Sequence, residues 1–187
     1  TEIASLGEFG LIDRLTQHLG KRNNTTLMAA GDDAAVIDLG DEALLLSTDM
    51  LTEGIDFDLS YFPLKHLGYK TIIRGVNDIL AMNARPEQVV VALGISAKIS
   101  VEALDELYEG MEHACEELGI DLVGGDTTAS MNGLIITVTA TGRAKKEDIV
   151  YRSGAKEHDL ICITSNLGAA YMGLHLLERE KRVLKDV

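Results

Sequence analysis

Four short acidic motifs contain the residues of this chain that are best suited to chemistry. Each joins a carboxylate to Gly, Ser, Thr or Asn at the edge of an apolar stretch, and they read Gly31-Asp32-Asp33, Ser47-Thr48-Asp49, Asn77-Asp78 and Gly124-Gly125-Asp126-Thr127-Thr128. Such residues are poor core material, whereas Mg²⁺ prefers oxygen ligands and commonly binds carboxylates together with substrate phosphates. If the motifs converge in space, they predict a metal-dependent enzyme of phosphoryl transfer.

Three of the four motifs also have a plain structural interpretation. Gly31-Asp32-Asp33 is typical of a turn, Ser47-Thr48-Asp49 of a helix cap or an Asx-turn, and Gly124-Gly125 of a glycine bulge. Asn77-Asp78 is different, because it falls in the second half of an expected helix. Asp has a poor helix propensity and the wrong charge for that end of the helix dipole, which favours a functional role.

The net charge of −13 argues against partners that require a basic face, namely nucleic acid and an anionic membrane surface. A nucleotide is compatible with that charge, because Mg²⁺ held by carboxylates and phosphates reverses the local sign. The sequence contains neither a P-loop motif nor an apolar run of about 20 residues. Cys115 and Cys162 lie outside any CxxC pair, which indicates reduced thiols and a cytoplasmic protein.

Hydrophobic periodicity predicts the elements that must position the motifs. Helices are expected over 5–19, from Pro63 to about 84, from a cap at Ser100 to 118, and from 167 onwards. Strands are expected over 34–39, 43–47, 51–57, 88–95, 120–123, 134–142 and 160–164. The flexible basic segment Arg152-Ser153-Gly154-Ala155-Lys156 suits either a phosphate or a domain hinge, and the latter interpretation places a domain boundary near residue 148.

This order of elements, without a Gly-rich dinucleotide loop, predicts an α+β fold with a mixed sheet and helices on one face. In the segment 134–142, Ile136, Val138 and Ala140 alternate with three threonines, as in a half-exposed antiparallel strand. The alternation indicates that the other face of the sheet becomes buried only when two chains associate.

In order along the chain, the motifs resemble the amino-terminal half of the thiamine-monophosphate kinases, in the aminoimidazole-ribonucleotide-synthase-like superfamily. Besides the four acidic motifs, the resemblance includes Glu53-Gly54, the segment from Ile79 to Ala84, and the hinge from Arg152 to Lys156. It implies that two sheets close a barrel in a homodimer. It also implies direct, in-line transfer of a phosphoryl group from ATP to thiamine monophosphate with Mg²⁺, giving thiamine diphosphate in the last step of its biosynthesis.

The resemblance also assigns roles to residues rather than to whole motifs, with no residue of the chain acting as a covalent catalyst. The family's metal-binding positions correspond to Asp33, Ser47, Thr48, Asp49, Asp78 and Asp126. Its nucleotide-binding positions correspond to Tyr108, Gly125, Asp126 and Arg152. Where the family commonly has a substrate-contacting His, this chain has Asp56, an acid whose charge suits the cationic thiamine.

The resemblance further implies two domains: an ATP- and Mg²⁺-binding dimerisation domain over 1–147, and a hinge with the truncated beginning of a carboxy-terminal domain over 148–187. Other members of the superfamily are the alternatives, either an aminoimidazole ribonucleotide synthase or a selenophosphate synthase. The latter normally has a Cys or selenocysteine in a Gly-rich amino-terminal segment, which is absent here. A non-catalytic dimeric scaffold is a further alternative, although clustered acids without a cation are costly.

Overall fold

A computed structural model describes residues 2–185, so Thr1, Asp186 and Val187, at the outer ends of the two predicted domains, lie outside the described residues. The elements follow one another as η1 (Ile3–Ser5), α1 (Gly7–Thr16), β1 (Thr26–Met28), β2 (Ala35–Asp38), β3 (Glu42–Thr52), α2 (Leu64–Ala81), β4 (Arg85–Ile95), α3 (Val101–Leu118), β5 (Asp121–Ala129), β6 (Ile135–Lys145), η2 (Lys146–Asp148) and α4 (Ala169–Lys185). Within residues 2–185, no helix is both long enough and apolar enough to cross a membrane.

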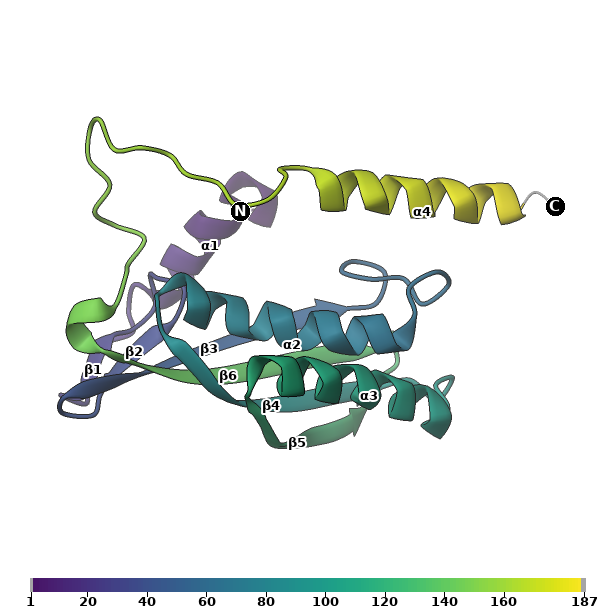
Figure 1. Cartoon of the computed structure of the whole chain (residues 1–187), viewed down its shortest axis with the longest axis horizontal. Coiled ribbons are helices and arrows are strands. Elements are labelled where there is room, and N and C mark those ends of the chain that lie inside the picture. The colour runs from purple at the N-terminus through teal and green to yellow at the C-terminus, as the bar shows by residue number, and fades with distance from the viewer. Residues whose placement is uncertain (1, 186–187) are drawn as a thin grey trace.

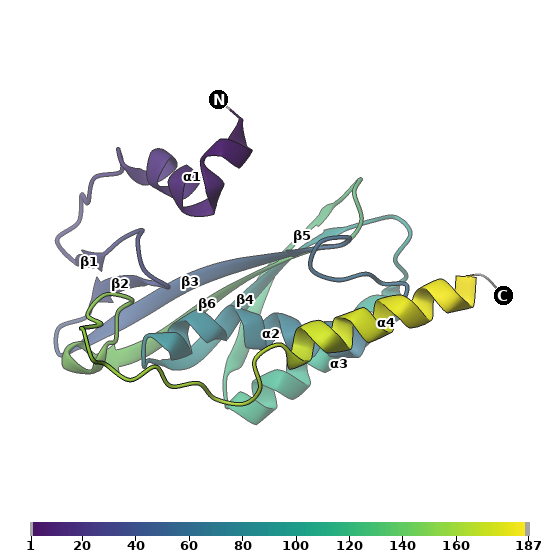
Figure 2. The same ribbon diagram turned by 90° about the horizontal axis from the view of Figure 1, so that it is seen from above.

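The strands form one mixed sheet in the order β1-β2-β3-β6-β4-β5. β4 and β5 are parallel, and the other neighbouring pairs are antiparallel. The helices α2 and α3 lie side by side on the same face of this sheet (Figures 1 and 2). The prediction of an α+β fold with a mixed sheet and helices on one face is therefore confirmed.

The alternation predicted for β6 defines the two faces of the sheet. Ile136, Val138 and Ala140 are fully buried beneath the helices, whereas Thr137 and Thr139 are half-buried on the opposite face. Because neighbouring residues of a strand point to opposite faces, each strand has one row of core side chains and one outward row. We call the face that carries α2 and α3 the helix face, and the opposite one the open face.

The helices α2 and α3 pack unusually closely because two glycines meet at their contact. A Cβ added to Gly68 would lie 1.9 Å from the carbonyl oxygen of Leu107, and one added to Gly110 would lie 1.9 Å from that of Lys65. Leu67, Ile72 and Val76 of α2 are fully buried, as expected of the core-facing stripe. The second half of α2 is held close to the sheet at Gly75, where an added Cβ would lie 2.6 Å from the side chain of Val138 on β6.

The strands β3 and β5 are longer than predicted, and each therefore contains an acidic motif that was expected at its end. The segments 43–47 and 51–57 are not separate strands, because β3 pairs continuously with β6 from Glu42 to Thr52. Ser47-Thr48-Asp49 therefore lies within a strand rather than at its end. Similarly, β5 pairs with β4 as far as Ala129, so Gly124 to Thr128 also lie inside a strand.

The strand predicted over 160–164 is wrong, because no strand is assigned there and no neighbouring strand pairs with it. Its apolar side chains are open to solvent, Leu160 being 90% and Ile161 96% exposed. The helix expected next is present as α4, beginning at Ala169. The apolar stripe of α1 also faces outward, and Phe9 is 67% exposed.

Candidate functional site

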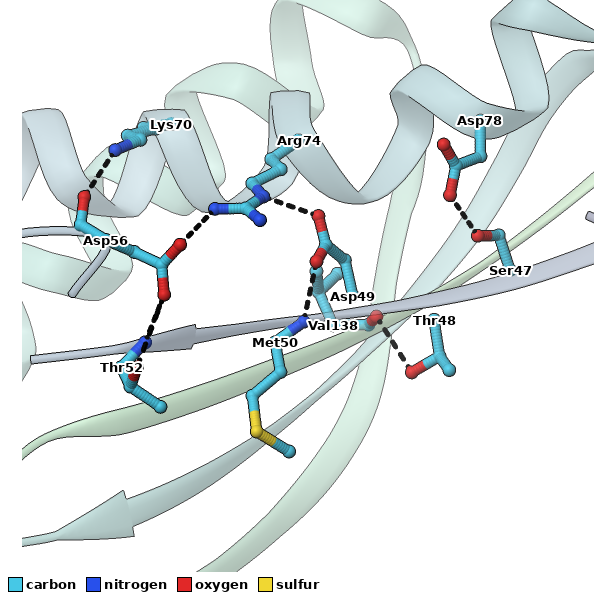
Figure 3. Close-up of polar contacts among 10 residues, drawn as sticks. All are labelled: Ser47, Thr48, Asp49, Met50, Thr52, Asp56, Lys70, Arg74, Asp78 and Val138. Atoms are coloured by element: carbon cyan, nitrogen blue, oxygen red, sulfur yellow. Dashed lines mark hydrogen bonds and ion pairs between the residues drawn. The ribbon is translucent and has the colours of Figure 1, made fainter. Parts of the chain in front are cut away.

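Two polar contacts join β3 to the second half of α2 (Figure 3). The hydroxyl of Ser47 donates to Oδ2 of Asp78 at 2.6 Å, and Nε of Arg74 donates to Oδ2 of Asp49 at 2.6 Å. Alternate residues of a strand are about 6.8 Å apart, and residues four apart in a helix rise by about 6 Å. The two spacings match, so α2, running antiparallel to β3, brings Asp78 and Arg74 opposite Ser47 and Asp49.

The loop after β3 returns Asp56 to the same helix. Its Oδ1 accepts from Nη1 of Arg74 at 2.6 Å, and its Oδ2 accepts from the backbone N–H of Thr52 at 2.8 Å. Lys70 donates to the carbonyl oxygen of Asp56 at 2.8 Å. Burial acts to raise the pKa of Asp56, but the hydrogen bonds from Thr52 and Arg74 outweigh it and lower that pKa.

The hinge residue Arg152 joins the first acidic motif. Its Nε donates to Oδ1 of Asp33 at 2.8 Å, and its backbone N–H donates to Oδ2 of Asp32 at 3.2 Å. The hydrogen bond with Asp33 raises the pKa of Arg152, and the nearby charges of Asp32 and Asp78 act in the same direction. Segments about 120 positions apart in the chain therefore meet beside the second half of α2.

Two of the predicted metal ligands lie on the open face instead. The hydroxyl of Thr48 is 3.0 Å from that of Thr139 on β6, on the face opposite to Ser47 and Asp49. Asp126 is exposed and lines a shallow depression with Ala92 and Thr137. The adjacent Ser47 and Thr48 therefore direct their hydroxyl groups to opposite sides of the sheet.

The order and register of the strands give the distance between Asp126 and β3. Met50 is opposite Thr137, Thr137 is opposite Ala92, and Ala92 is opposite Asp126. Three steps of about 4.8 Å place Asp126 about 14 Å from β3. Side chains of Asp49 and Asp126 from one chain are thus too far apart to bind the same ion.

Within residues 2–185, no three His, Cys, Asp or Glu side chains come together in an arrangement that could hold a metal ion. Of the six predicted ligands, Thr48 and Asp126 lie on the open face, and Asp33 and Asp49 are paired with arginines. The six predicted ligands nevertheless offer only carboxylate and hydroxyl oxygens, the donors that suit Mg²⁺. The metal assignments therefore stay predictions.

Two predicted nucleotide contacts lie away from the acidic residues of the helix face. A Cβ on Gly125 would lie 1.7 Å from the carbonyl oxygen of Val91, so this glycine is required by the approach of β4 to β5. A register shift lies beside it, between Val89 and Val90 of β4. Tyr108 is 39% exposed on α3. The close approach of β4 thus explains why residue 125 is a glycine. The nucleotide-binding roles of Gly125 and Tyr108 stay predictions.

A pocket of about 680 Å³ lies beside Asp56. Its walls include Asp56, Phe62 and Lys70 on one side and Tyr171 and Leu174 of α4 on the other. Nζ of Lys70 lies 5.2 Å from the centre of the Phe62 ring, within the range of a cation–π contact. The pocket therefore combines aromatic surface with a cation and a carboxylate.

Sequence reasoning overlooked three residues of this region, namely Thr52, Lys70 and Arg74. A signal existed for the two cations, because they are four residues apart and so lie on the same side of the expected helix. Their partners, however, lie on β3 and in the loop that follows it, which periodicity along the helix does not identify.

Comparison with known proteins gives relatives that share almost the whole chain. Thiamine-monophosphate kinase of Mycobacterium tuberculosis is 35% identical over 175 residues, which cover 93% of this chain and 52% of that protein. The Bacillus subtilis protein of the same name is 31% identical over 176 residues, covering 94% and 54%. This chain therefore spans about half the length of the curated relatives that it matches.

Solved structures agree with the sequence relatives. The structure described as "AaThiL complexed with AMPPCP and TMP" superposes with a TM-score of 0.85 at 31% identity, covering 96% of this chain and 55% of that one. The family "AIR synthase related protein, N-terminal domain" matches residues 31–144, which contain the four acidic motifs. The chain therefore belongs to the family of AIR synthase related proteins, whose N-terminal domain it contains.

Proposed function

We propose that this chain is the ATP-binding part of a kinase that transfers the terminal phosphoryl group of ATP directly to thiamine monophosphate, giving thiamine diphosphate and ADP. The observation that carries the proposal is the meeting of separate acidic motifs around β3 and α2, where Asp33, Ser47, Asp49 and Asp78 present oxygen atoms. The names of the relatives, and the AMPPCP and TMP of the solved structure, add the substrates.

Mg²⁺ would be held by the side chains of Asp33, Ser47, Thr48, Asp49, Asp78 and Asp126. When bound, it would offset the negative charge of the phosphates during in-line transfer. The chain's own residues would orient those phosphates, with no covalent intermediate on the protein. Because Thr48 and Asp126 lie on the open face, they would act on phosphates bound on that side of the sheet.

Tyr108, Gly125, Asp126 and Arg152 would contact the nucleotide. The planar guanidinium of Arg152 suits bidentate binding of phosphate oxygens. It is paired with Asp33 through a contact that is partly open to solvent, the side chain of Arg152 being 52% and that of Asp33 19% exposed. Such a contact is weak enough for a phosphate to replace it.

Asp56 would contact thiamine monophosphate in the pocket between the loop after β3 and α4. The aromatic walls of that pocket suit a flat heterocycle, and Lys70 suits a phosphate ester. Asp56 already accepts hydrogen bonds from Arg74 and Thr52, so its carboxylate is held in position before any ligand binds. It would thus present a preorganised negative charge at the pocket wall.

We further propose that two copies associate through their open faces and close a barrel. Leu46, Met50 and Val90 of that face are 37%, 54% and 39% exposed, which leaves apolar surface for a partner chain. The predicted boundary near residue 148 would separate this dimerisation domain from the remainder. Cys115 and Cys162 are both free thiols, in keeping with a cytoplasmic protein.

The test is an assay of ADP formation by the full-length protein, with and without thiamine monophosphate and with and without Mg²⁺. ADP should form only when both are present, and light scattering should give the mass of a dimer. ADP formed with the substrate of aminoimidazole ribonucleotide synthase or selenophosphate synthase instead would identify a sister enzyme. Complete lack of ADP formation would favour the scaffold.

A further inference from the structure

Arg74 holds two carboxylates that come from different segments. Nε lies 2.6 Å from Oδ2 of Asp49, and Nη1 lies 2.6 Å from Oδ1 of Asp56 (Figure 3). The second oxygen of each carboxylate is also engaged, because Oδ1 of Asp49 accepts from the N–H of Met50 and Oδ2 of Asp56 accepts from that of Thr52, both at 2.8 Å. One guanidinium thus fixes a predicted metal ligand and the predicted substrate contact at once.

Arg74 is better protected from water than Arg152, although the acidic partners of the two arginines are covered to a similar degree. The side chain of Arg74 is 38% exposed and that of Arg152 is 52% exposed, whereas Asp49, Asp56 and Asp33 are 25%, 17% and 19% exposed. Arg74 also lies inside an 18-residue helix, whereas Arg152 lies in a segment without regular structure. A ligand can therefore displace Arg152 more easily than Arg74.

A cation that binds Asp49 must compete with the guanidinium already there. Asp78 differs, because its partner is the uncharged hydroxyl of Ser47. We infer that Arg74 is a positioning residue that acts as a built-in counter-ion: it keeps Asp49 and Asp56 in place without metal, and it weakens the binding of a divalent cation at Asp49. The inference rests on the proposed function, which supplies Mg²⁺ as that cation.

The test measures the affinity of the full-length protein for Mn²⁺, a paramagnetic substitute for Mg²⁺, without nucleotide and by electron paramagnetic resonance. Removing one positive charge about 5 Å from a divalent ion should raise its affinity about tenfold, even at the dielectric constant of water. Arg74→Gln should therefore bind Mn²⁺ about tenfold more tightly than the wild type. Damage to the fold would lower the affinity, so the direction of the change separates the two explanations.

Arg143→Gln is the matched control, since Arg143 pairs with Glu87 at 3.1 Å on the same sheet and away from the acidic motifs. It should leave the Mn²⁺ affinity unchanged. Unchanged or weaker binding by Arg74→Gln would overturn the inference while leaving the metal-dependent function standing. If neither the wild type nor Arg74→Gln binds Mn²⁺ without nucleotide, the inference fails, whereas the proposed metal is decided separately by the Mg²⁺ dependence of ADP formation.

A measurement on the wild type covers the case in which Arg74→Gln does not fold. The Nε–H resonance of Arg74, assigned by its absence from the spectrum of Arg74→Lys, should shift as Mg²⁺ is added, because the ion draws Asp49 away from the guanidinium. The Nε–H resonance of Arg143 should stay in place. A resonance of Arg74 that is unchanged at saturating Mg²⁺ would refute the competition.

Discussion

The acidic side chains on the two faces of the central sheet differ in whether they have a polar partner within the chain. On the helix face, Asp49 is paired with Arg74 and Asp78 with Ser47, close to the buried core. On the open face, Asp126 makes no side-chain hydrogen bond or ion pair with the side chains that the structure describes, those of residues 2–180. An acid that loses water requires a counter-ion, whereas an exposed one does not. The helix face is therefore prearranged by the chain itself, and Asp126 remains available to a ligand.

The largest expected effect comes from breaking the structure of the helix face. Gly68→Ala would place a Cβ 1.9 Å from the carbonyl oxygen of Leu107. This clash can be relieved only by moving the backbone of α2 or α3, which is energetically costly. We expect the free energy of unfolding to fall by about 3 kcal/mol or more, measured by urea denaturation. Gly173→Ala in α4 is the control, because it meets no atom within 4 Å and should not destabilise. Equal stability of the two variants would show that the close helix contact is unimportant.

A smaller effect, confined to activity, is expected on the open face. Asp126→Asn should lower kcat/KM for Mg²⁺-ATP in the full-length protein about 100-fold, equivalent to about 2.7 kcal/mol, because the carboxylate proposed to bind the metal would lose its charge. Its free energy of unfolding should change by less than about 0.5 kcal/mol, since Asp126 is exposed. Asp121→Asn, at the start of the same strand, should leave both quantities unchanged. Full activity of Asp126→Asn would remove the functional contrast between the faces.

The smallest effect concerns the pH dependence of the helix face. Because the pKa of Asp56 is lowered in the folded state, its hydrogen bonds stabilise the fold above the unfolded pKa of about 4. This contribution is lost as the pH falls through the lower, folded value. Asp56→Asn should therefore cost about 1–2 kcal/mol at pH 7 and less at pH 2, measured by chemical denaturation at both pH values.

Asp105→Asn is the control for this pH dependence. Asp105 is an exposed residue of α3 whose side chain makes no hydrogen bond or ion pair with the described side chains of residues 2–180, so its substitution should have little effect at either pH. A cost of Asp56→Asn that stayed constant between the two pH values would contradict the role given to the carboxylate charge.

Local patterns predicted most of the elements, because helices and strands impose their own periods on buried side chains. The alternation in β6 identified its core row, and hydrophobic periodicity predicted the helix from Pro63 to about residue 84 that is observed as α2. The same patterns misplaced the ends of strands. The strand β3 continues through Ser47-Thr48-Asp49 because it pairs with β6 there, although these polar residues are typical of the end of a strand.

The apolar segment 160–164 illustrates the reverse error. It has the composition of a strand, yet a strand also needs a neighbour for its backbone hydrogen bonds. No such neighbour exists within residues 2–185. Composition alone therefore overestimated the regular structure after the hinge.

The sequence by itself determined the class of fold, the acidic motifs and the resemblance that they carry, because residue type and spacing are local properties. Only the tertiary structure decided which motifs meet. It placed Asp49 beside Arg74 and Asp33 beside Arg152, while directing Thr48 and Asp126 to the open face. The physical reason is that the two-residue period of strands assigns each side chain to a face, and the register between strands fixes which distant partner it meets.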